Sequence, residues 1–165
     1  MRRLFTIGYE GVELSAFLAK LASEKVDVLL DIRELPLSRR RGFSKTELSR
    51  ALTAAGIRYQ HERALGAPRP IRHRLRRDGN LASYFRAFDR YLLTQTPELE
   101  RLAEGCMGNV ALLCFERDYT TCHRSSVARE LGRLADLVPT HLMVGDHGKV
   151  REEARVYPRQ GVPAA

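Results

Sequence analysis

The feature that most constrains the fold is a regular alternation of short apolar segments with longer segments of helical period. The apolar, β-branched segments predict strands at 4–8, 26–30, 57–60, 110–115 and 140–144. The segments with helical spacing predict helices at 12–23, 44–55, 80–94, 97–103 and 121–135. Strands that alternate with helices form parallel sheets that are covered on both faces. The sequence therefore predicts a single three-layer α/β domain with a mainly parallel sheet and helices on both faces.

Local signals predict several of the helix boundaries. Ser44 and Glu47 have the spacing of a capping box, and Asn80 is suited to cap a later helix. Pro68 and Pro70 disfavour a helix, so the segment rich in Arg and Pro that follows the third strand is expected to be a loop. The 80–94 helix is expected to bury one apolar stripe. That stripe consists of Leu81, Phe85, Phe88 and Leu92.

Length and composition indicate one domain and exclude several classes of protein. The 165 residues are 44% hydrophobic and 29% charged, values typical of a globular chain and not of a disordered one. No window approaches the ~18 apolar residues of a membrane span, and no signal peptide is recognisable. Three cysteines, an odd number, argue against a disulfide framework and for the cytoplasm. We expect a domain over residues 1–145 and a loosely ordered C-terminal tail over 146–165.

The positive charge is concentrated in one basic insert at residues 33–77. This segment holds 13 Lys and Arg against three acids, whereas the other residues hold 15 basic and 17 acidic side chains. Arg dominates, and its planar guanidinium suits phosphate contacts. A solvated basic loop is the alternative, but such a concentration favours a nucleic-acid partner, with DNA the expected form. The expected contacts are Arg40, Arg41, Lys45, Arg69, Arg72, Arg74, Arg76 and Arg77.

Two acidic residues follow predicted buried strands and are the candidate catalytic groups. In a parallel sheet, ligands bind beyond the carboxyl ends of the strands. Asp31 and Glu116 both lie there, where one could activate water and the other stabilise a developing cation. The alternative is that each carboxylate pairs with an arginine and holds a loop. The expected substrate-binding residues near this edge are Tyr9, Arg33, Ser38, Arg39, Cys122, His123 and Arg124.

The cysteines and histidines allow a second interpretation of the same edge. Cys114, Cys122 and His123 could bind zinc if His61 or His141 completed the set. The cysteines lack the short paired spacing of common zinc sites, however, so no metal and no cofactor is expected. A helix end that binds an anion, with Arg124 on a phosphate, is the simpler interpretation.

A set of motifs in a fixed order resembles a known bacterial and archaeal family. The motifs are Thr6-Ile7-Gly8-Tyr9-Glu10-Gly11, Asp31-Ile32-Arg33 with Pro36 and Ser38-Arg39, Phe43, Gly56-Ile57-Arg58-Tyr59, Leu65-Gly66, and Leu113-Cys114-Phe115-Glu116 with Cys122-His123-Arg124. They are similar to those of the family catalogued as domain of unknown function 488, over roughly residues 4–145. The resemblance implies a single α/β domain. It also implies a link to DNA repair, and to modified-base glycosylases of phage defence.

Charge, site and resemblance together predict an enzyme that acts on nucleic acid, most concretely a DNA glycosylase that removes a modified base. Such an enzyme flips its target base out of the duplex, and Asp31 or Glu116 would assist cleavage of the N-glycosidic bond. A metal-dependent nuclease or phosphoesterase is one alternative, with Glu10, Asp31 and Glu116 on Mg²⁺. A non-catalytic module that binds nucleic acid or a nucleotide is the other. No membrane partner is expected.

Overall fold

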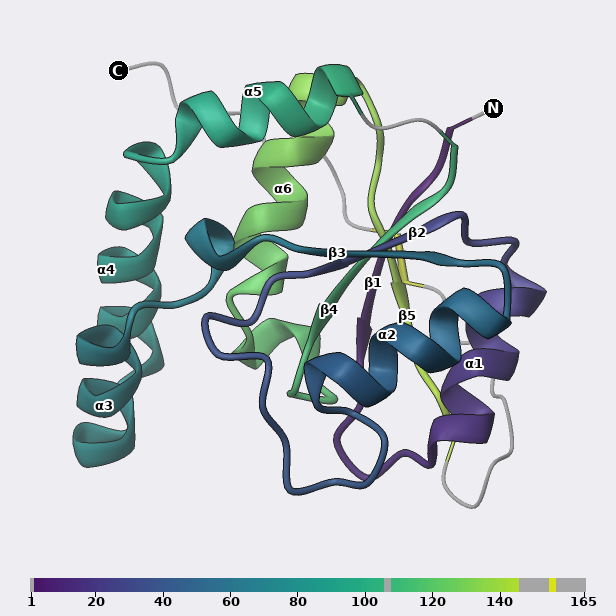
Figure 1. Ribbon diagram of the computed structural model, residues 1–165. Helices are drawn as coiled ribbons and strands as arrows, with labels where there is room; N and C mark the ends of the chain where they lie inside the picture. Colours follow the sequence, from purple (N-terminus) through teal and green to yellow (C-terminus); the bar gives the residue numbers. More distant parts are fainter. Residues whose placement is uncertain (1, 106–107, 146–154, 157–165) are drawn as a thin grey trace.

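A parallel sheet forms the centre of the molecule (Figure 1). The structure is a computed structural model that describes residues 2–105, 108–145 and 155–156. The parallel strands are β1 (Leu4–Gly8), β2 (Val28–Asp31), β3 (Arg58–His61), β4 (Val110–Cys114) and β5 (Thr140–Leu142). They are arranged in the order β3-β2-β4-β1-β5, and the two-residue β6 (Arg155–Val156) pairs antiparallel with β5. The predicted α/β domain is confirmed.

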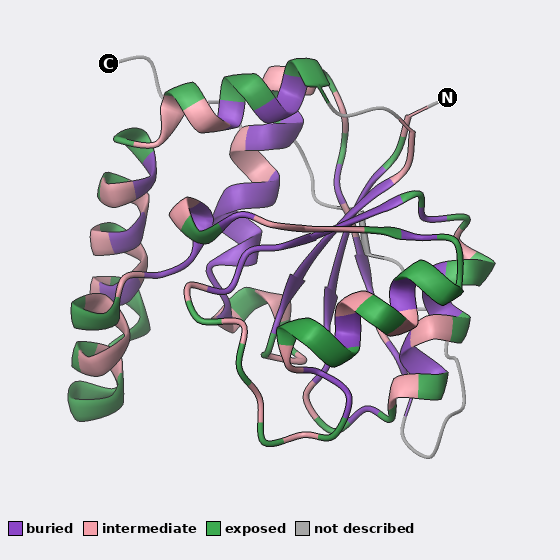
Figure 2. Cartoon of the chain, in the orientation of Figure 1, coloured by how far each residue is buried: buried purple, intermediate pink, exposed green. Residues whose placement is uncertain are grey.

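Helices cover both faces of the sheet, as the alternation of segments predicted (Figures 1 and 2). The helices are α1 (Leu14–Ser23), α2 (Lys45–Ala54), α3 (Arg69–Asp78), α4 (Leu81–Leu93), α5 (Thr96–Gly105) and α6 (Arg124–Ala135). Two short 3₁₀ helices, η1 (Arg63–Leu65) and η2 (Tyr119–Thr121), follow β3 and β4.

Successive residues of β2 and β4 enter different hydrophobic cores, because side chains alternate between the two faces of a strand. Leu30 and Leu112 belong to the core under α4, α5 and α6. Leu29 and Leu113 belong to the core under α1 and α2. Every residue of β1, β2 and β4 is buried, which explains why these strands are mainly apolar, with Thr6 and Asp31 as exceptions.

The prediction of a loop in the Arg- and Pro-rich segment is wrong, because residues 69–78 form the helix α3. Pro68 is the N-cap of α3 and Pro70 lies in its first turn, where a proline does not remove an intrahelical hydrogen bond. Gly79 ends the helix in the left-handed conformation, with φ 62°. The helix lies beside α4 and has no buried side chain. Arg69, Arg74, Arg76 and Arg77 are exposed, whereas Arg72 is half-buried.

Two other local predictions need correction. Ser44 is the N-cap of α2, but its hydroxyl exchanges hydrogen bonds with the backbone of Ser38 at 3.0 and 3.1 Å, and no capping box forms. Glu47 instead accepts a hydrogen bond from the backbone of Gly42. In α4, Asn80 caps Ser83 as expected. The buried stripe of α4 consists of Tyr84, Phe88 and Leu92, whereas Leu81 is exposed.

The connections of the sheet reverse direction between β1 and β4. The helix that follows β1 packs on one face of the sheet, and the helix that follows β4 packs on the other. Ligand sites of open α/β sheets form at such a reversal, beyond the carboxyl ends of the strands.

Two further sequence predictions concern the C-terminal tail and membrane spans. The predicted tail at 146–165 lies outside the described residues, apart from 155–156. No helix in the described ranges is long and apolar enough to cross a membrane.

Candidate functional site

The backbones that follow β1 and β4 meet at the carboxyl edge of the sheet. Gly8 is in register with Cys114, and the amide of Glu10 donates to the carbonyl oxygen of Phe115 at 2.9 Å. A Cβ atom on Gly8 would lie 1.9 Å from the carbonyl oxygen of Glu116. Only glycine therefore allows the two segments to approach so closely. This contact brings Glu116 to the point where the sheet connections reverse.

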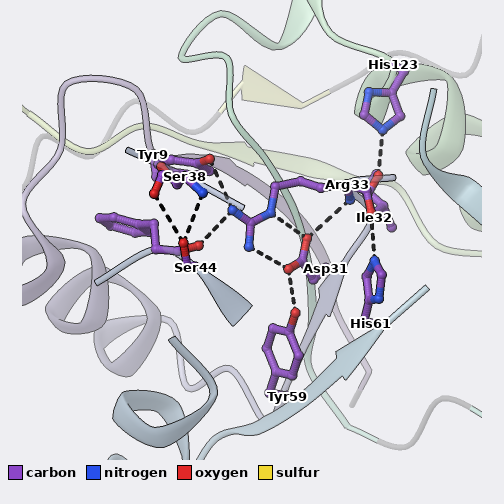
Figure 3. Close-up of polar contacts among 10 residues, drawn as sticks. Tyr9, Asp31, Ile32, Arg33, Ser38, Ser44, Tyr59, His61 and His123 are labelled. Carbon is purple, nitrogen blue, oxygen red and sulfur yellow. Dashed lines mark hydrogen bonds and ion pairs between the residues drawn. The ribbon is translucent and has the colours of Figure 1, made fainter. Parts of the chain in front are cut away.

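Asp31 and Arg33 form a buried ion pair at the end of β2 (Figure 3). The Arg33 guanidinium donates to both carboxylate oxygens of Asp31, at 2.8 and 2.7 Å. The backbone amide of Arg33 adds a bond of 3.2 Å, and the hydroxyl of Tyr59 adds one of 2.6 Å. The Asp31 carboxylate, which is 0% exposed, therefore has protein donors on both of its oxygens.

The remaining donors of Arg33 are also used inside the protein. Its Nη1 donates to the hydroxyl of Tyr9 at 3.1 Å and to the carbonyl oxygen of Phe43 at 2.8 Å. Burial opposes the charge of Arg33, but the hydrogen bonds and charge of Asp31 outweigh burial and raise the pKa of Arg33. Burial and the bond to Asp31 also raise the pKa of Tyr59. Arg33 is thus a permanently charged partner of Asp31.

A second cluster forms where the end of β4 meets the start of α6. The Nδ1 atom of His123 lies 3.6 Å from Sγ of Cys114 and 3.8 Å from Sγ of Cys122. All three side chains are buried. Sγ of Cys114 also lies 3.0 Å from a carboxylate oxygen of Glu116. The opposite ring nitrogen of His123, Nε2, donates to the carbonyl oxygen of Ile32 at 2.8 Å (Figure 3).

The groups of this cluster influence one another's protonation. Burial, with the negative charge of Cys122, raises the pKa of Glu116 to about 7. Burial also raises the pKa of Cys114. Burial also disfavours the thiolate form of Cys122. At this residue, however, a hydrogen bond from Cys114 and the positive charges of His123 and Arg124 outweigh burial and lower the pKa of Cys122.

Arg124 braces the loop between β4 and α6. Its guanidinium is fully buried and donates to the carbonyl oxygens of Glu116 and Arg117, the latter at 3.1 Å. Its Nε atom donates to the hydroxyl of Thr6 at 3.3 Å. In this structure Arg124 supports the loop and does not reach outward to a phosphate. His141, which contacts Thr6 at 2.7 Å, has a pKa lowered to about 4 by burial and by the charge of Arg124.

The family model described as "Domain of unknown function DUF488" matches residues 13–131. The chain belongs to the DUF488 family. No curated protein and no solved structure matches it.

The structure of this DUF488 chain brings some of the predicted site residues together and separates others. Glu116, Cys122 and His123 lie in one cluster, and Asp31 and Arg33 form the neighbouring pair. Tyr9 is buried, and its ring stacks on Phe43 at 4.5 Å. Glu10, Asp31 and Glu116 do not form a metal-binding group within the described residues.

The predicted histidine ligands His61 and His141 are not part of the cluster either. His61 donates to the carbonyl oxygen of Arg33 at 2.8 Å, and His141 contacts Thr6.

The predicted contacts to nucleic acid fall into two groups in this DUF488 chain. Several of them are used internally: Arg40 pairs with Glu13, Arg72 with Glu34, and Arg74 with Asp78. The hydroxyl of Ser38 accepts from the backbone of Arg40 at 3.0 Å. Arg69 lies 3.4 Å from His73. Among the predicted contacts, those that are exposed and form no ion pair within the described part of the chain are Arg39, Arg41, Lys45, Arg69, Arg76 and Arg77.

Two residues at the site were not predicted from the sequence. Tyr59 lies on β3 in register with Leu29, and its hydroxyl reaches diagonally to Asp31, two residues further along β2. Phe115 is 44% exposed although it directly follows the most apolar strand, and its ring meets Tyr9 edge-on at 5.3 Å. An aromatic residue at a strand end, next to a carboxylate, was the available signal.

Proposed function

We propose that this DUF488 protein acts enzymatically on nucleic acid and hydrolyses the N-glycosidic bond of a modified base in DNA. The observation that carries the proposal is the position of the Glu116 carboxylate and its lack of an ion-pair partner among the described residues. Glu116 is half-buried, follows β4 at the reversal of the sheet connections, and forms no ion pair among the described residues. Reactive carboxylates occupy such positions in open α/β sheets.

Glu116 and Asp31 have different roles in this proposal. Hydrolysis of a glycosidic bond passes through a cation-like sugar, which a carboxylate stabilises while it positions the attacking water. Asp31 is enclosed by Arg33 and Tyr59, and its charge is already balanced. Glu116 is therefore the catalytic carboxylate, and Asp31 is a positioning residue that anchors the end of β2.

The exposed ring of Phe115 supplies a surface for an extruded base. Phe115 lies next to Glu116 in the chain and packs edge-on against the buried Tyr9. A base that leaves the duplex loses its stacking energy, and an aromatic side chain restores roughly 1–3 kcal/mol of it. In this proposal Phe115, and not the buried Tyr9, contacts the base.

Unpaired cations extend from this edge of the sheet to α3. Arg39 and Arg41 lie in the loop between β2 and α2, which the side chain of Arg40 fastens to the carbonyl oxygen of Val12, just beyond β1. On α3, Arg76 and Arg77 are exposed. Exposed cations without acidic partners release counterions when they contact phosphates, and this release drives binding to DNA.

The test is an incubation of the full chain with a panel of DNAs that carry different modified bases, with unmodified DNA and RNA alongside. The expected products are a free base, identified by mass, and abasic sites that break only after alkali treatment, without added Mg²⁺. Glu116→Gln should reduce the rate by at least about 100-fold. Glu100→Gln, an exposed change on α5, is the matched control and should not alter the rate.

The other outcomes distinguish the alternatives. Strand breaks that need Mg²⁺ and no alkali would support a nuclease in place of a glycosylase. Intact glycosidic bonds across the whole panel, together with tight binding to DNA, would reduce the protein to a binding module. Full activity of Glu116→Gln would overturn the assignment of the catalytic carboxylate.

A further inference from the structure

Three side chains of metal-ligating type converge at the junction of β4 and α6. Sγ of Cys114, Sγ of Cys122 and Nδ1 of His123 all lie within 4.8 Å of one another. We infer that these three residues bind a divalent cation that prefers sulfur and nitrogen ligands, and that zinc is this cation. The inference concerns metal binding alone, so it does not depend on whether the protein is a glycosylase.

The distances between the ligand atoms suit one tetrahedral ion. Zinc bonds to cysteine sulfur at about 2.3 Å and to histidine nitrogen at about 2.05 Å, so tetrahedral geometry separates the two ligand atoms by about 3.6 Å. The separations from Nδ1 of His123 are 3.6 Å to Cys114 and 3.8 Å to Cys122. An ion therefore fits among the three atoms with only small side-chain movements.

The histidine is held in the tautomer that a metal requires. A carbonyl oxygen can only accept a hydrogen bond, so the contact of 2.8 Å with Ile32 places a proton on Nε2 of His123. In neutral His123, Nδ1 then carries a lone pair that is directed toward the two sulfur atoms. Metal-binding histidines commonly donate their second ring N–H to a backbone carbonyl. The ring of Phe88 packs edge-on against His123 at 5.1 Å and restricts its rotation.

The surroundings also favour thiolate ligands. The backbone amide of Arg124, in the first turn of α6, donates to Sγ of Cys122 at 3.4 Å. Amides at a helix N-terminus stabilise negative charge on such an atom. The guanidinium of Arg124 is buried close by and braces the loop that joins the two cysteines.

Three protein ligands leave the fourth tetrahedral position to water or to a substrate atom. Glu116 lies 3.0 Å from Cys114, so its carboxylate is next to whatever occupies that position. Sites with three protein ligands and one open position are typical of catalytic zinc. We therefore assign Glu116 to the immediate surroundings of the ion and not to its ligand set.

The experiment measures metal content and does not depend on activity. The full chain is purified anaerobically, dialysed against metal-free buffer and analysed for metals by mass spectrometry. It is then titrated with Zn²⁺ against a chromophoric chelator, and separately with Co²⁺. We expect one zinc ion per chain and a thiolate-to-Co²⁺ charge-transfer absorption. Cys122→Ser removes one of the three ligands and should weaken zinc binding by at least ~100-fold.

Cys106→Ser is the matched control, because it changes the third cysteine of the chain and should leave binding intact. Circular dichroism shows whether Cys122→Ser retains the fold. If this variant does not fold, the zinc and Co²⁺ measurements on the unmodified chain still decide whether the chain binds zinc through thiolates. Three results would overturn the inference. They are an unmodified chain without stoichiometric zinc, a Co²⁺ complex without the thiolate absorption, or a Cys114–Cys122 disulfide in the anaerobic protein.

Discussion

The buried pair of Asp31 and Arg33 should be a main support of the fold at the site. Asp31→Asn keeps the shape of the side chain but removes its charge. Arg33, which is 6% exposed, then stays charged without its carboxylate partner. Removing one member of a buried pair costs about 3–5 kcal/mol, and whole domains have only about 5–15 kcal/mol of stability. We expect Asp31→Asn to lower the free energy of unfolding by about 3–5 kcal/mol.

A double-mutant cycle separates the pair from its surroundings. Arg33→Met removes the buried charge, so the double variant with Asp31→Asn should be more stable than the sum of the single changes implies, by about 2–3 kcal/mol. Tyr59→Phe is the matched control, because it removes one hydrogen bond of 2.6 Å to Asp31 and keeps the ion pair. That change should cost about 1.5–3 kcal/mol.

The assay is urea unfolding followed by circular dichroism, with the midpoint and slope compared for each variant. An Asp31→Asn protein that unfolds within about 1 kcal/mol of the unmodified chain, at the same slope, would refute the reasoning. Asp31 would then be free of Arg33 in solution and available for catalysis, as one interpretation of the sequence proposed.

Three further predictions test other contacts of the site. Gly8→Ala places a Cβ atom 1.9 Å from the carbonyl oxygen of Glu116 and should cost about 3 kcal/mol or more in thermal unfolding. Gly11→Ala meets no atom within 4 Å and should cost only about 1–2 kcal/mol through its positive φ, so equal losses would contradict the packing argument. The pKa of His141 is lowered to about 4 by burial and by the charge of Arg124. The unfolded chain therefore binds a proton on His141 more readily than the folded chain does. Stability should therefore fall by up to about 3 kcal/mol as pH falls from 6.5 to 4, and His141→Gln should flatten that dependence in urea titrations at several pH values. Arg76→Glu with Arg77→Glu should weaken DNA binding and reduce the slope of log affinity against log salt by about 2, while the unfolding midpoint stays unchanged. An unaltered slope would exclude these two side chains from the contact.

Strands with a clear apolar pattern could be predicted from the sequence. The helix α3 could not, because the effect of a proline depends on its position within a helix. Strands β1, β2 and β4 are buried on both faces and therefore appear as mainly apolar runs. The helix α3 was missed because Pro68 and Pro70 were weighed as helix breakers. A proline breaks a helix only in its interior, and these two lie at the first turn. The sequence alone does not reveal which of the two cases applies.

The convergence of Cys114 with Cys122 and His123 was harder to predict from spacing. Common zinc sites bring ligands together through short turns within one segment. Here the ligands come from a strand end and a helix start, and the intervening loop folds back through η2. The buried Arg124 fixes that loop by binding its carbonyl groups, and this tertiary contact leaves no periodic signal in the sequence.

The Asp31–Arg33 pair and the cysteine–histidine cluster are connected through the backbone that joins Asp31 to Arg33. The amide of Arg33 bonds to the Asp31 carboxylate at 3.2 Å and so fixes the turn that contains Ile32. The carbonyl oxygen of Ile32 in turn holds Nε2 of His123 at 2.8 Å. Loss of the Asp31 charge should therefore disturb His123 without any contact between Asp31 and a substrate. A loss of activity in Asp31→Asn would not by itself make Asp31 catalytic. If zinc affinity and stability fall together with activity, Asp31 acts by positioning. If activity falls while both are preserved, Asp31 participates in the chemical step.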